Sequence, residues 1–414
     1  MAVDNINQHK SFVQNRRSSL LAAIFLMATS AIGPGFITQT ATFTATLGVA
    51  FAFGILASIL IDFVVQQNIW RVVTLTQMNA AEVANRAIPG SGYLLAVLVI
   101  FGGLVFNIGN IAGAGLGLNA LFGLSPKLGG LISAAIAIYI FASRRAGVAL
   151  DRMLIALGVV MIVLTLYVAL VSHPPLGMAL RETVFPSNIN FAAITTIVGG
   201  TVGGYISYAG AHRLLDKGIS GKEHIKEVSS AANRGIIVVG IMRYVLFLAI
   251  FGVVASGVTI DLSSHNANPA SQAFLAAAGN VGLRIFGIVL WAAALSSVVG
   301  AAWTSVSFIS VFRPGITERQ RNIATLIFIA FTLVVYLCLG TAPAALPVFA
   351  GGFNGLVLPL GLTLVLWVGW RRADLMDGYR YPRWLLWLGM ITCIMTWYMA
   401  IMSVSTIFNF LKIA

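Results

Sequence analysis

Long runs of apolar residues, separated by short polar segments, extend through almost the whole chain of 414 residues. A helix needs about 20 predominantly apolar residues to cross the hydrocarbon core of a membrane, and most of these runs approach or exceed that length. The pattern therefore predicts an all-α polytopic membrane protein. We place eleven transmembrane helices at 18–47, 49–70, 92–118, 126–143, 151–172, 191–214, 234–256, 281–312, 320–340, 343–370 and 382–411.

Two of the predicted helices are interrupted in the middle by residues that weaken a helix. The first contains Gly33-Pro34-Gly35, where the proline removes a backbone hydrogen bond, and the sixth contains a glycine-rich stretch at 199–204. Helices one and six correspond if the chain is a five-plus-five inverted repeat with an eleventh helix appended. Paired breaks of this kind are typical of a binding site at the membrane midplane. Alternatively, the glycines only let neighbouring helices pack closely.

This repeat defines the expected organisation of the chain. We expect a cytoplasmic N-terminal segment at 1–17, a first transmembrane repeat of helices one to five at 18–172, a second of helices six to ten at 191–370, and helix eleven at 382–411. The first apolar run resembles a secretory signal peptide, but its apolar character continues to Leu47. We therefore interpret it as a retained helix.

The composition agrees with a membrane protein and argues against other classes. Hydrophobic residues make up 59% and charged residues 9% of the chain, and the mean hydropathy of +0.94 excludes a water-soluble fold. The predicted helices hold neither a nucleophile with its base nor a metal motif such as HExxH, so we do not expect an enzyme. We expect no cofactor either.

The net charge of +13 would suggest a nucleic-acid partner in a soluble protein, so the position of the basic residues matters. Twenty of the 25 Lys and Arg residues fall on the side of the predicted helices that holds the N-terminus, and only four fall on the other side. Positive charge concentrates on the cytoplasmic side of membrane proteins. The distribution thus predicts a multi-pass protein of the plasma (inner) membrane with a cytoplasmic N-terminus and an extracytoplasmic C-terminus, and no nucleic-acid partner.

Four segments of the sequence resemble the Nramp family of divalent-metal transporters. The segment 33–36, Gly-Pro-Gly-Phe, stands where that family carries Asp-Pro-Gly-Asn, and 200–205, Gly-Thr-Val-Gly-Gly-Tyr, stands where it carries Ala-Thr-Val-Met-Pro-His. The segments 296–300 and 354–359 are similar to its eighth and tenth helices. The resemblance covers most of the chain and implies a LeuT-like 5+5 inverted repeat with discontinuous helices 1 and 6. Helices one, two, six and seven would then move as a bundle.

The positions that correspond to the metal ligands of the family carry different residues here. The aspartate is replaced by Gly33, the asparagine by Phe36, the methionine by Gly203, and the two histidines by Tyr205 and Gly210. A divalent cation prefers anionic oxygens or a soft donor, and these replacements supply neither. The sequence therefore predicts that no side chain at these positions binds a metal.

Loss of the carboxylate favours a ligand of the opposite charge. The second halves of broken helices begin with free backbone N–H groups, which attract anions, and here these groups lie near 36–38 and 205–207. We predict a secondary-active transporter of a small organic anion, a mono- or dicarboxylate, working by alternating access. The alternative is a transporter of magnesium or manganese. The predicted substrate-binding residues are Gly33, Pro34, Gly35, Phe36, Thr38, Gln39, Gly203, Gly204, Tyr205, Ser207, Asn107 and Asn354.

Each of these polar side chains also has a purely structural interpretation. Hydroxyl groups in helices often bond only to the backbone of the preceding turn. Buried asparagines, here Asn107 and Asn110, often bond to neighbouring helices instead of to a ligand. His212, next to Arg213 at the predicted cytoplasmic end of helix six, is expected to be a solvated end residue.

Two charged residues inside predicted helices are candidates for a functional role, because charge within a membrane is costly. At about 1.5 Å per residue, Asp62 in helix two and Arg243 in helix seven each lie about 12 Å from the cytoplasmic end of their helix. They could form a pair that holds two helices in register. They could also couple transport to protons or attract an anion, and the sequence leaves protons and sodium open as co-substrates.

Overall fold

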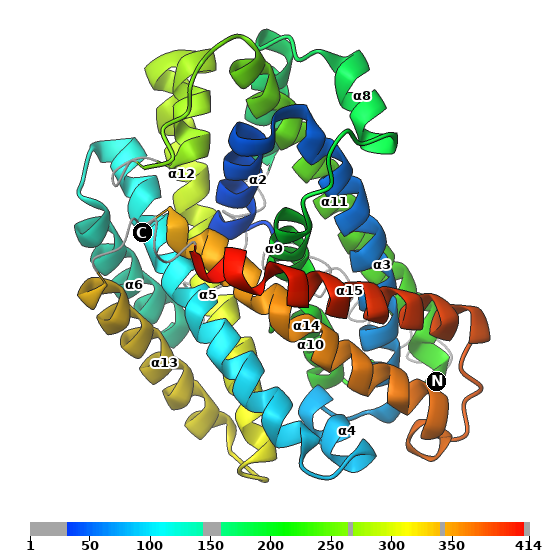
Figure 1. Cartoon of the computed structure of the whole chain (residues 1–414). Helices are drawn as coiled ribbons and strands as arrows, with labels where there is room; N and C mark the ends of the chain where they lie inside the picture. The colour runs from blue at the N-terminus through cyan, green and yellow to red at the C-terminus, as the bar shows by residue number, and fades with distance from the viewer. Residues whose placement is uncertain (1–30, 144–158, 264–267, 340–343, 410–414) are drawn as a thin grey trace, which may run out of the picture.

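The computed structural model describes residues 31–143, 159–263, 268–339 and 344–409, and these are helical with no strand among them (Figure 1). The fifth predicted helix is described from Val159 to Val171. Short 3₁₀ segments are Gly48–Ala50, Lys222–His224, Phe308–Val311 and Ala373–Met376. The helices are α2 (Pro34–Leu47), α3 (Phe51–Thr76), α4 (Ala80–Ala87), α5 (Ser91–Phe122), α6 (Pro126–Ala142), α8 (Leu176–Val184), α9 (Phe191–Val202), α10 (Ile206–Asp216), α11 (Ile225–Ala255), α12 (Pro269–Ser307), α13 (Glu318–Cys338), α14 (Ala345–Arg371) and α15 (Arg383–Asn409).

Most predicted helices coincide with observed ones, and the differences have local causes. Within the described part of the chain, seven helices are long and apolar enough to span a membrane. The number is eight if a pair of helices bent by 110° counts as one span. The count of eleven transmembrane helices therefore stays a prediction. The halves α9 and α10 are each too short to qualify, and α6 has 17 residues. The segment 1–17 lies outside the described residues. So does the first half of helix one up to residue 30.

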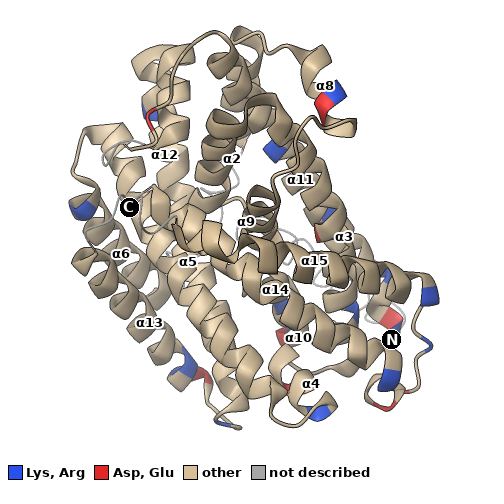
Figure 2. Ribbon diagram, in the orientation of Figure 1, with Lys and Arg blue, Asp and Glu red and all other residues tan. Residues whose placement is uncertain are grey.

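Helices that are distant in sequence pack side by side around the centre of the molecule. In Figure 1, α2 rises to a bend at the top and α3 returns beside it, while α9 lies near the middle of the molecule. The main packing pairs are α5 with α12, α14 with α9, and α11 with α3. Most charged residues lie at the two ends of this bundle (Figure 2). Among the described residues the buried polar side chains are mostly neutral, and the buried charges of Asp62 and Arg243 are candidates for function.

The two short helices α4 and α8 were not predicted, because each lies in a segment between apolar runs. A sharp turn also divides α12, where Gly279 adopts φ 61°, a conformation that favours glycine. The predicted helix beginning at residue 281 therefore corresponds to the part of α12 after this turn. The part before it, from Pro269, was missed.

The glycines of helix six serve two different purposes. Gly199 and Gly200 lie inside α9, where a Cβ atom at Gly199 would overlap the backbone of Gly351 and Gly355 in α14. Close packing therefore explains this part of the stretch. Gly203, in contrast, lies beyond the end of α9, at the break itself.

We expect Gly199→Ala to destabilise the protein by about 1–3 kcal/mol, because the added methyl group overpacks a backbone contact that cannot relax easily. The measurement is the thermal unfolding temperature of the purified protein in detergent. Gly177→Ala in α8 is the matched control, because a Cβ atom there meets nothing within 4 Å. Equal unfolding temperatures for the two variants would contradict the predicted α9–α14 contact.

Candidate functional site

The break in helix one lies where the sequence predicts it. Ala31 is helical, Ile32 and Gly33 are not, and α2 begins at Pro34. Gly33 is extended, with φ −97° and ψ −170°, and a Cβ atom on it would lie 2.6 Å from Oγ of Ser297 in α12. The position that resembles the family's aspartate is therefore packed directly against another helix.

The break in helix six is a three-residue turn between α9 and α10. Gly203 is extended, with φ −82° and ψ 155°, Gly204 has φ 53°, and Tyr205 precedes α10. The hydroxyl group of Ser207 donates a hydrogen bond to the carbonyl oxygen of Val202 across this turn. Glycine at 204 thus permits a left-handed conformation that a larger residue rarely adopts.

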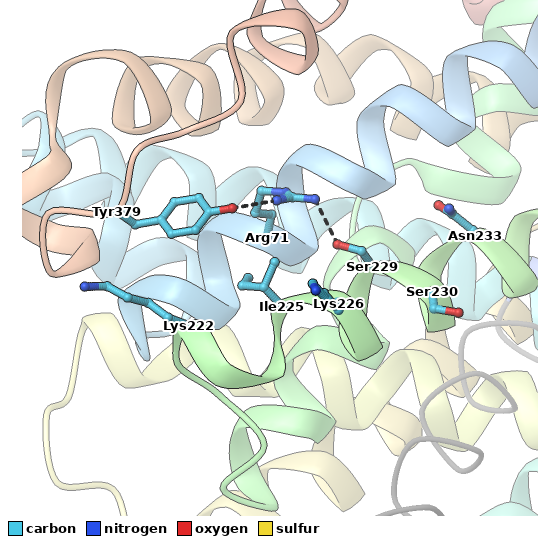
Figure 3. Close-up of a pocket in the computed structure, with 8 residues that line it drawn as sticks. All are labelled: Arg71, Lys222, Ile225, Lys226, Ser229, Ser230, Asn233 and Tyr379. Carbon is cyan, nitrogen blue, oxygen red and sulfur yellow. Dashed lines mark hydrogen bonds between the residues drawn. The ribbon is translucent and has the colours of Figure 1, made fainter.

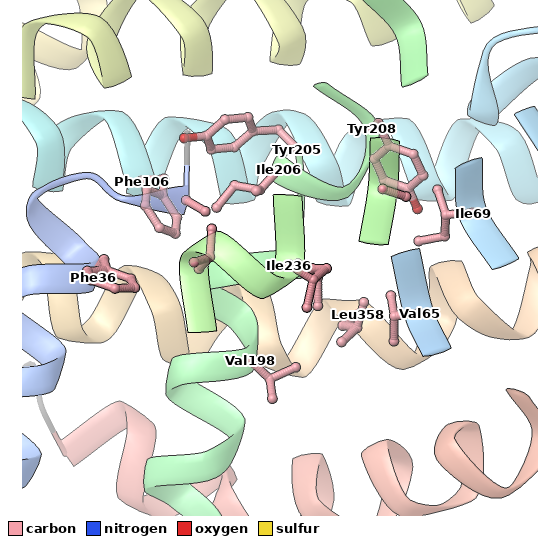
Figure 4. Close-up of a cluster of buried hydrophobic side chains, with 14 of the residues drawn as sticks. Phe36, Val65, Ile69, Phe106, Val198, Tyr205, Ile206, Tyr208, Ile236 and Leu358 are labelled. Carbon is pink, nitrogen blue, oxygen red and sulfur yellow. The ribbon is translucent and has the colours of Figure 1, made fainter. Parts of the chain in front are cut away.

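Aromatic and apolar side chains fill the space beside the two breaks. The rings of Phe106 and Tyr205 meet edge to face, with centroids 5.6 Å apart, and Figure 4 shows them close to Phe36 and Ile206. Phe36 and Tyr205 are both buried, with exposed fractions of 1% and 0%. Two of the positions that resemble the metal ligands of the family therefore carry large packed rings.

Two predicted residues, Gln39 and Asn354, direct an amide oxygen toward the helix-six segment. Gln39 Nε2 donates to the carbonyl oxygen of Pro347 at 3.0 Å, and Asn354 Nδ2 donates to Gly102 and Ala350 at 3.1 and 2.9 Å. Because carbonyl oxygens only accept, these bonds fix the orientation of both amides. The side-chain oxygens of both residues are buried without a hydrogen-bond partner among the described residues, and they lie against Gly200 and Gly204.

Three other predicted residues are already engaged in the protein. Asn107 Nδ2 donates to Oγ1 of Thr332 in α13 at 3.1 Å, and Thr38 Oγ1 accepts from Asn268 at 2.7 Å. The Ser207 hydroxyl group bonds to its own broken helix, as described above. The structural interpretation fits these groups better than contact with a substrate. Asn110, one turn from Asn107, instead lies beside Gly33 and Tyr205.

The two buried charges both attach to α9 and form no direct ion pair within 4.0 Å in the described part of the chain. Asp62 Oδ2 accepts from the Thr201 hydroxyl group at 2.6 Å, and Arg243 donates to the carbonyl oxygen of Ile197 at 3.1 Å. The Arg243 guanidinium group also lies over the ring of Phe36, with Cζ 4.3 Å from its centroid. The exposed fractions of Asp62 and Arg243 are 2% and 1%. The two charged side chains therefore do not pair directly, and each instead bonds to α9.

Arg243 retains unused hydrogen-bonding capacity beside the break in helix one. Its Nε and one terminal nitrogen are buried without a partner among the described residues. One carboxylate oxygen of Asp62 is also buried without a hydrogen-bond partner among these residues. Buried polar groups are normally satisfied, so these atoms mark Arg243 and Asp62 as candidate functional groups.

The prediction that His212 is a solvated end residue is wrong, because its exposed fraction is only 1%. Its Nε2 accepts from the backbone N–H of Ala80 at 3.2 Å, and its Nδ1 lies 3.1 Å from the Ser307 hydroxyl group. An Nε2 atom that accepts cannot carry the ring proton, so the proton resides on Nδ1. The sequence hides this contact because it depends on α4, which covers the end of α10.

In the described residues, no three His, Cys, Asp or Glu side chains come together in a group that could hold a metal ion. The polar groups near the breaks are amides, hydroxyls, one carboxylate and one guanidinium. Such a set offers hydrogen bonds and balanced charge. It lacks the clustered anionic or soft donors of a typical transition-metal site.

Comparison with known proteins identifies the family of this chain. Residues 24–406 match the family model described as natural resistance-associated macrophage protein-like. The chain belongs to the Nramp family. This Nramp chain is also 49% identical over 390 residues to the uncharacterized membrane protein YcsG of Bacillus subtilis (strain 168), with 94% of each chain covered.

Solved structures confirm the fold. A histidine-to-alanine mutant of the Eremococcus coleocola manganese transporter has a TM-score of 0.74 at 17% identity, covering 94% of this chain and 86% of its own. MhsT in complex with L-phenylalanine has a TM-score of 0.58 at 16% identity, covering 94% and 98%. The chain is therefore a multi-pass Nramp-family membrane transporter with a LeuT-like fold, and the predicted discontinuous helices 1 and 6 are confirmed.

We expect Thr201→Val to destabilise this Nramp protein by about 1–3 kcal/mol, because valine keeps the shape of threonine but leaves Asp62 without its hydrogen-bond donor. Thr201→Ser keeps the hydroxyl group and serves as the control. The measurement is again the thermal unfolding temperature in detergent. If the valine and serine variants unfold at the same temperature, the hydrogen bond between the Thr201 hydroxyl group and Asp62 contributes nothing to the stability of the protein.

Proposed function

We propose that this transporter carries a small organic anion, a mono- or dicarboxylate, through the region between the two helix breaks. The observation that carries the proposal is Arg243, a fully buried cation with two unpartnered nitrogens next to Phe36. Guanidinium groups bind carboxylates through two parallel hydrogen bonds, a geometry that also gives specificity. A carboxylate would therefore satisfy the free N–H groups of Arg243.

The surroundings of Arg243 support an anion in two further ways. Asp62 is bonded to Thr201, and the only group to which the guanidinium group donates among the described residues is the neutral carbonyl oxygen of Ile197. A fixed positive charge in a medium of low dielectric constant also repels a divalent cation. Gly33 has no side chain, so a ligand approaching α2 meets no negative charge there.

The second candidate substrate is a divalent metal ion, magnesium or manganese. Family membership and the manganese transporters among the structural neighbours favour this alternative over the anion. The free amide oxygens of Gln39 and Asn354 favour it too, since neutral oxygens can hold a partly hydrated magnesium ion. We place the anion first only because the buried guanidinium group lies at the helix-one break.

We propose in addition that Asp62 couples transport to protons. Its carboxylate and the Thr201 hydroxyl group are 2.6 Å apart, and the same hydroxyl oxygen is 2.9 Å from the carbonyl oxygen of Ile197. When Asp62 is charged, the hydroxyl proton points to the carboxylate. When Asp62 is protonated, it donates to Thr201 Oγ1, which then donates to Ile197. The same hydrogen-bonding geometry therefore accommodates Asp62 both with and without the carried proton.

We expect carboxylates to raise the unfolding temperature of the purified protein, because a ligand that binds only the folded state stabilises it by mass action. Gly33→Asp should abolish the shift, whereas Gly33→Asn should retain part of it. Both side chains meet Ser297, but only aspartate adds negative charge. The measurement is a thermal-shift panel of mono- and dicarboxylates, manganese and magnesium. A shift with manganese or magnesium and none with any carboxylate would establish the metal alternative instead.

We expect Asp62→Asn to remove the pH dependence of substrate uptake into proteoliposomes, because asparagine cannot exchange a proton. Glu223→Gln is the control, since Glu223 is an exposed carboxylate that pairs only with His224 among the described residues. Uptake by the control should keep the pH profile of the wild type. An Asp62→Asn variant with an unchanged profile would exclude this residue as the proton carrier.

A further inference from the structure

A cavity with a mostly polar lining lies where the end of α3 meets the start of α11. Its volume is about 560 Å³, which is within the range of small-molecule sites. Figure 3 shows the side chains around it, which come from α3, from the 3₁₀ segment before α11, from the first turns of α11, and from the segment between α14 and α15. The lining residues are Arg71, Lys222, Ile225, Lys226, Ser229, Ser230, Asn233 and Tyr379.

The lining carries three cationic side chains and no acidic one. Of the acids nearby, Glu223 and Glu227 both face His224, at 3.7 and 3.8 Å. Asp374 is held by Arg372 at 2.8 Å. Lys222 donates to a backbone carbonyl oxygen, that of Asp377. Within the described ranges, none of the three cations of the lining has a carboxylate within 4.0 Å.

Arg71 is positioned at the centre of this cavity by two neutral partners. Its terminal nitrogens donate to the hydroxyl groups of Tyr379 and Ser229, both at 3.0 Å (Figure 3). Its Nε is buried and has no hydrogen-bond partner in the part of the chain that the structure describes. Because both hydroxyl oxygens accept from Arg71, their own protons stay available to an acceptor. Cations and neutral donors thus converge on one space.

This cavity is distinct from the proposed substrate region. Arg71 lies nine residues after Asp62 on the same helix, which is about 13 Å along the helix axis. The predicted orientation places this end of α3 at the cytoplasmic membrane surface.

We propose that this cavity binds a phosphate group, supplied either by the headgroup of an anionic lipid or by free phosphate. A phosphate carries up to two negative charges and several strong acceptor oxygens, which match the three cations and the two hydroxyl donors. Basic pockets between transmembrane helices on the cytoplasmic side commonly bind phospholipid headgroups. The bound phosphate would connect α3 and α11 to the segment that follows α14.

The test is the unfolding temperature of the purified protein in detergent with sodium phosphate, compared with sodium chloride at the same ionic strength. A Lys222→Gln/Lys226→Gln double variant keeps the bonds of Arg71 and loses two charges of the site. Lys217→Gln, on an exposed residue outside the lining, is the matched control. We expect a phosphate-specific shift in the wild type and the control, and none in the double variant.

The second arm identifies the source of the phosphate. The same proteins are measured in nanodiscs of phosphatidylcholine with and without phosphatidic acid. Stabilisation by phosphatidic acid that disappears in the double variant identifies a lipid headgroup, and stabilisation only by sodium phosphate identifies the free anion. The proposal is overturned if neither probe stabilises the wild type, or if the double variant responds as the wild type does. These readouts do not depend on the transported substrate.

Discussion

The structure depends on one constraint, that every backbone polar group inside a membrane must find a partner within the protein. Two broken helices free several such groups at the centre of the bundle. Part of the cost is offset locally, by the bond of Ser207 to Val202 and by the N–H groups of Ile206 and Tyr208, which donate to the carbonyl oxygens of Gly203 and Tyr205 at 3.2 and 3.1 Å. Beside these backbone groups, the side-chain oxygens of Gln39 and Asn354 are buried without a hydrogen-bond partner among the described residues.

The same break geometry can serve a cation or an anion, and the side chains around it decide between them. Here the position equivalent to the family's aspartate is a glycine packed against Ser297, while a buried arginine lies over Phe36. The chain thus has the fold of the Nramp family, with a buried cation beside the break in helix one. Family membership points to a metal and the local electrostatics point to an anion. The identity of the substrate therefore tests whether fold or charge determines function in this chain.

The sequence predicts the fold well because its signals are local. Runs of apolar residues define the helices, and the breaks near Gly33 and Gly203 follow from residues that cannot continue a helix. The partners of side chains are not local, and here prediction fails. Asn107 meets α13 and His212 is covered by α4, which no pattern within their own helices reveals. The basic cavity around Arg71 likewise exists only after segments distant in sequence come together.

The most direct test of the central claim is substrate uptake by proteoliposomes that contain the purified protein. A radiolabelled carboxylate, chosen for the strongest stabilisation of the protein, and manganese are measured in the same preparation. The account predicts saturable uptake of the carboxylate above protein-free liposomes and no manganese uptake above that background. Saturable manganese uptake, with the carboxylate at background, would contradict it.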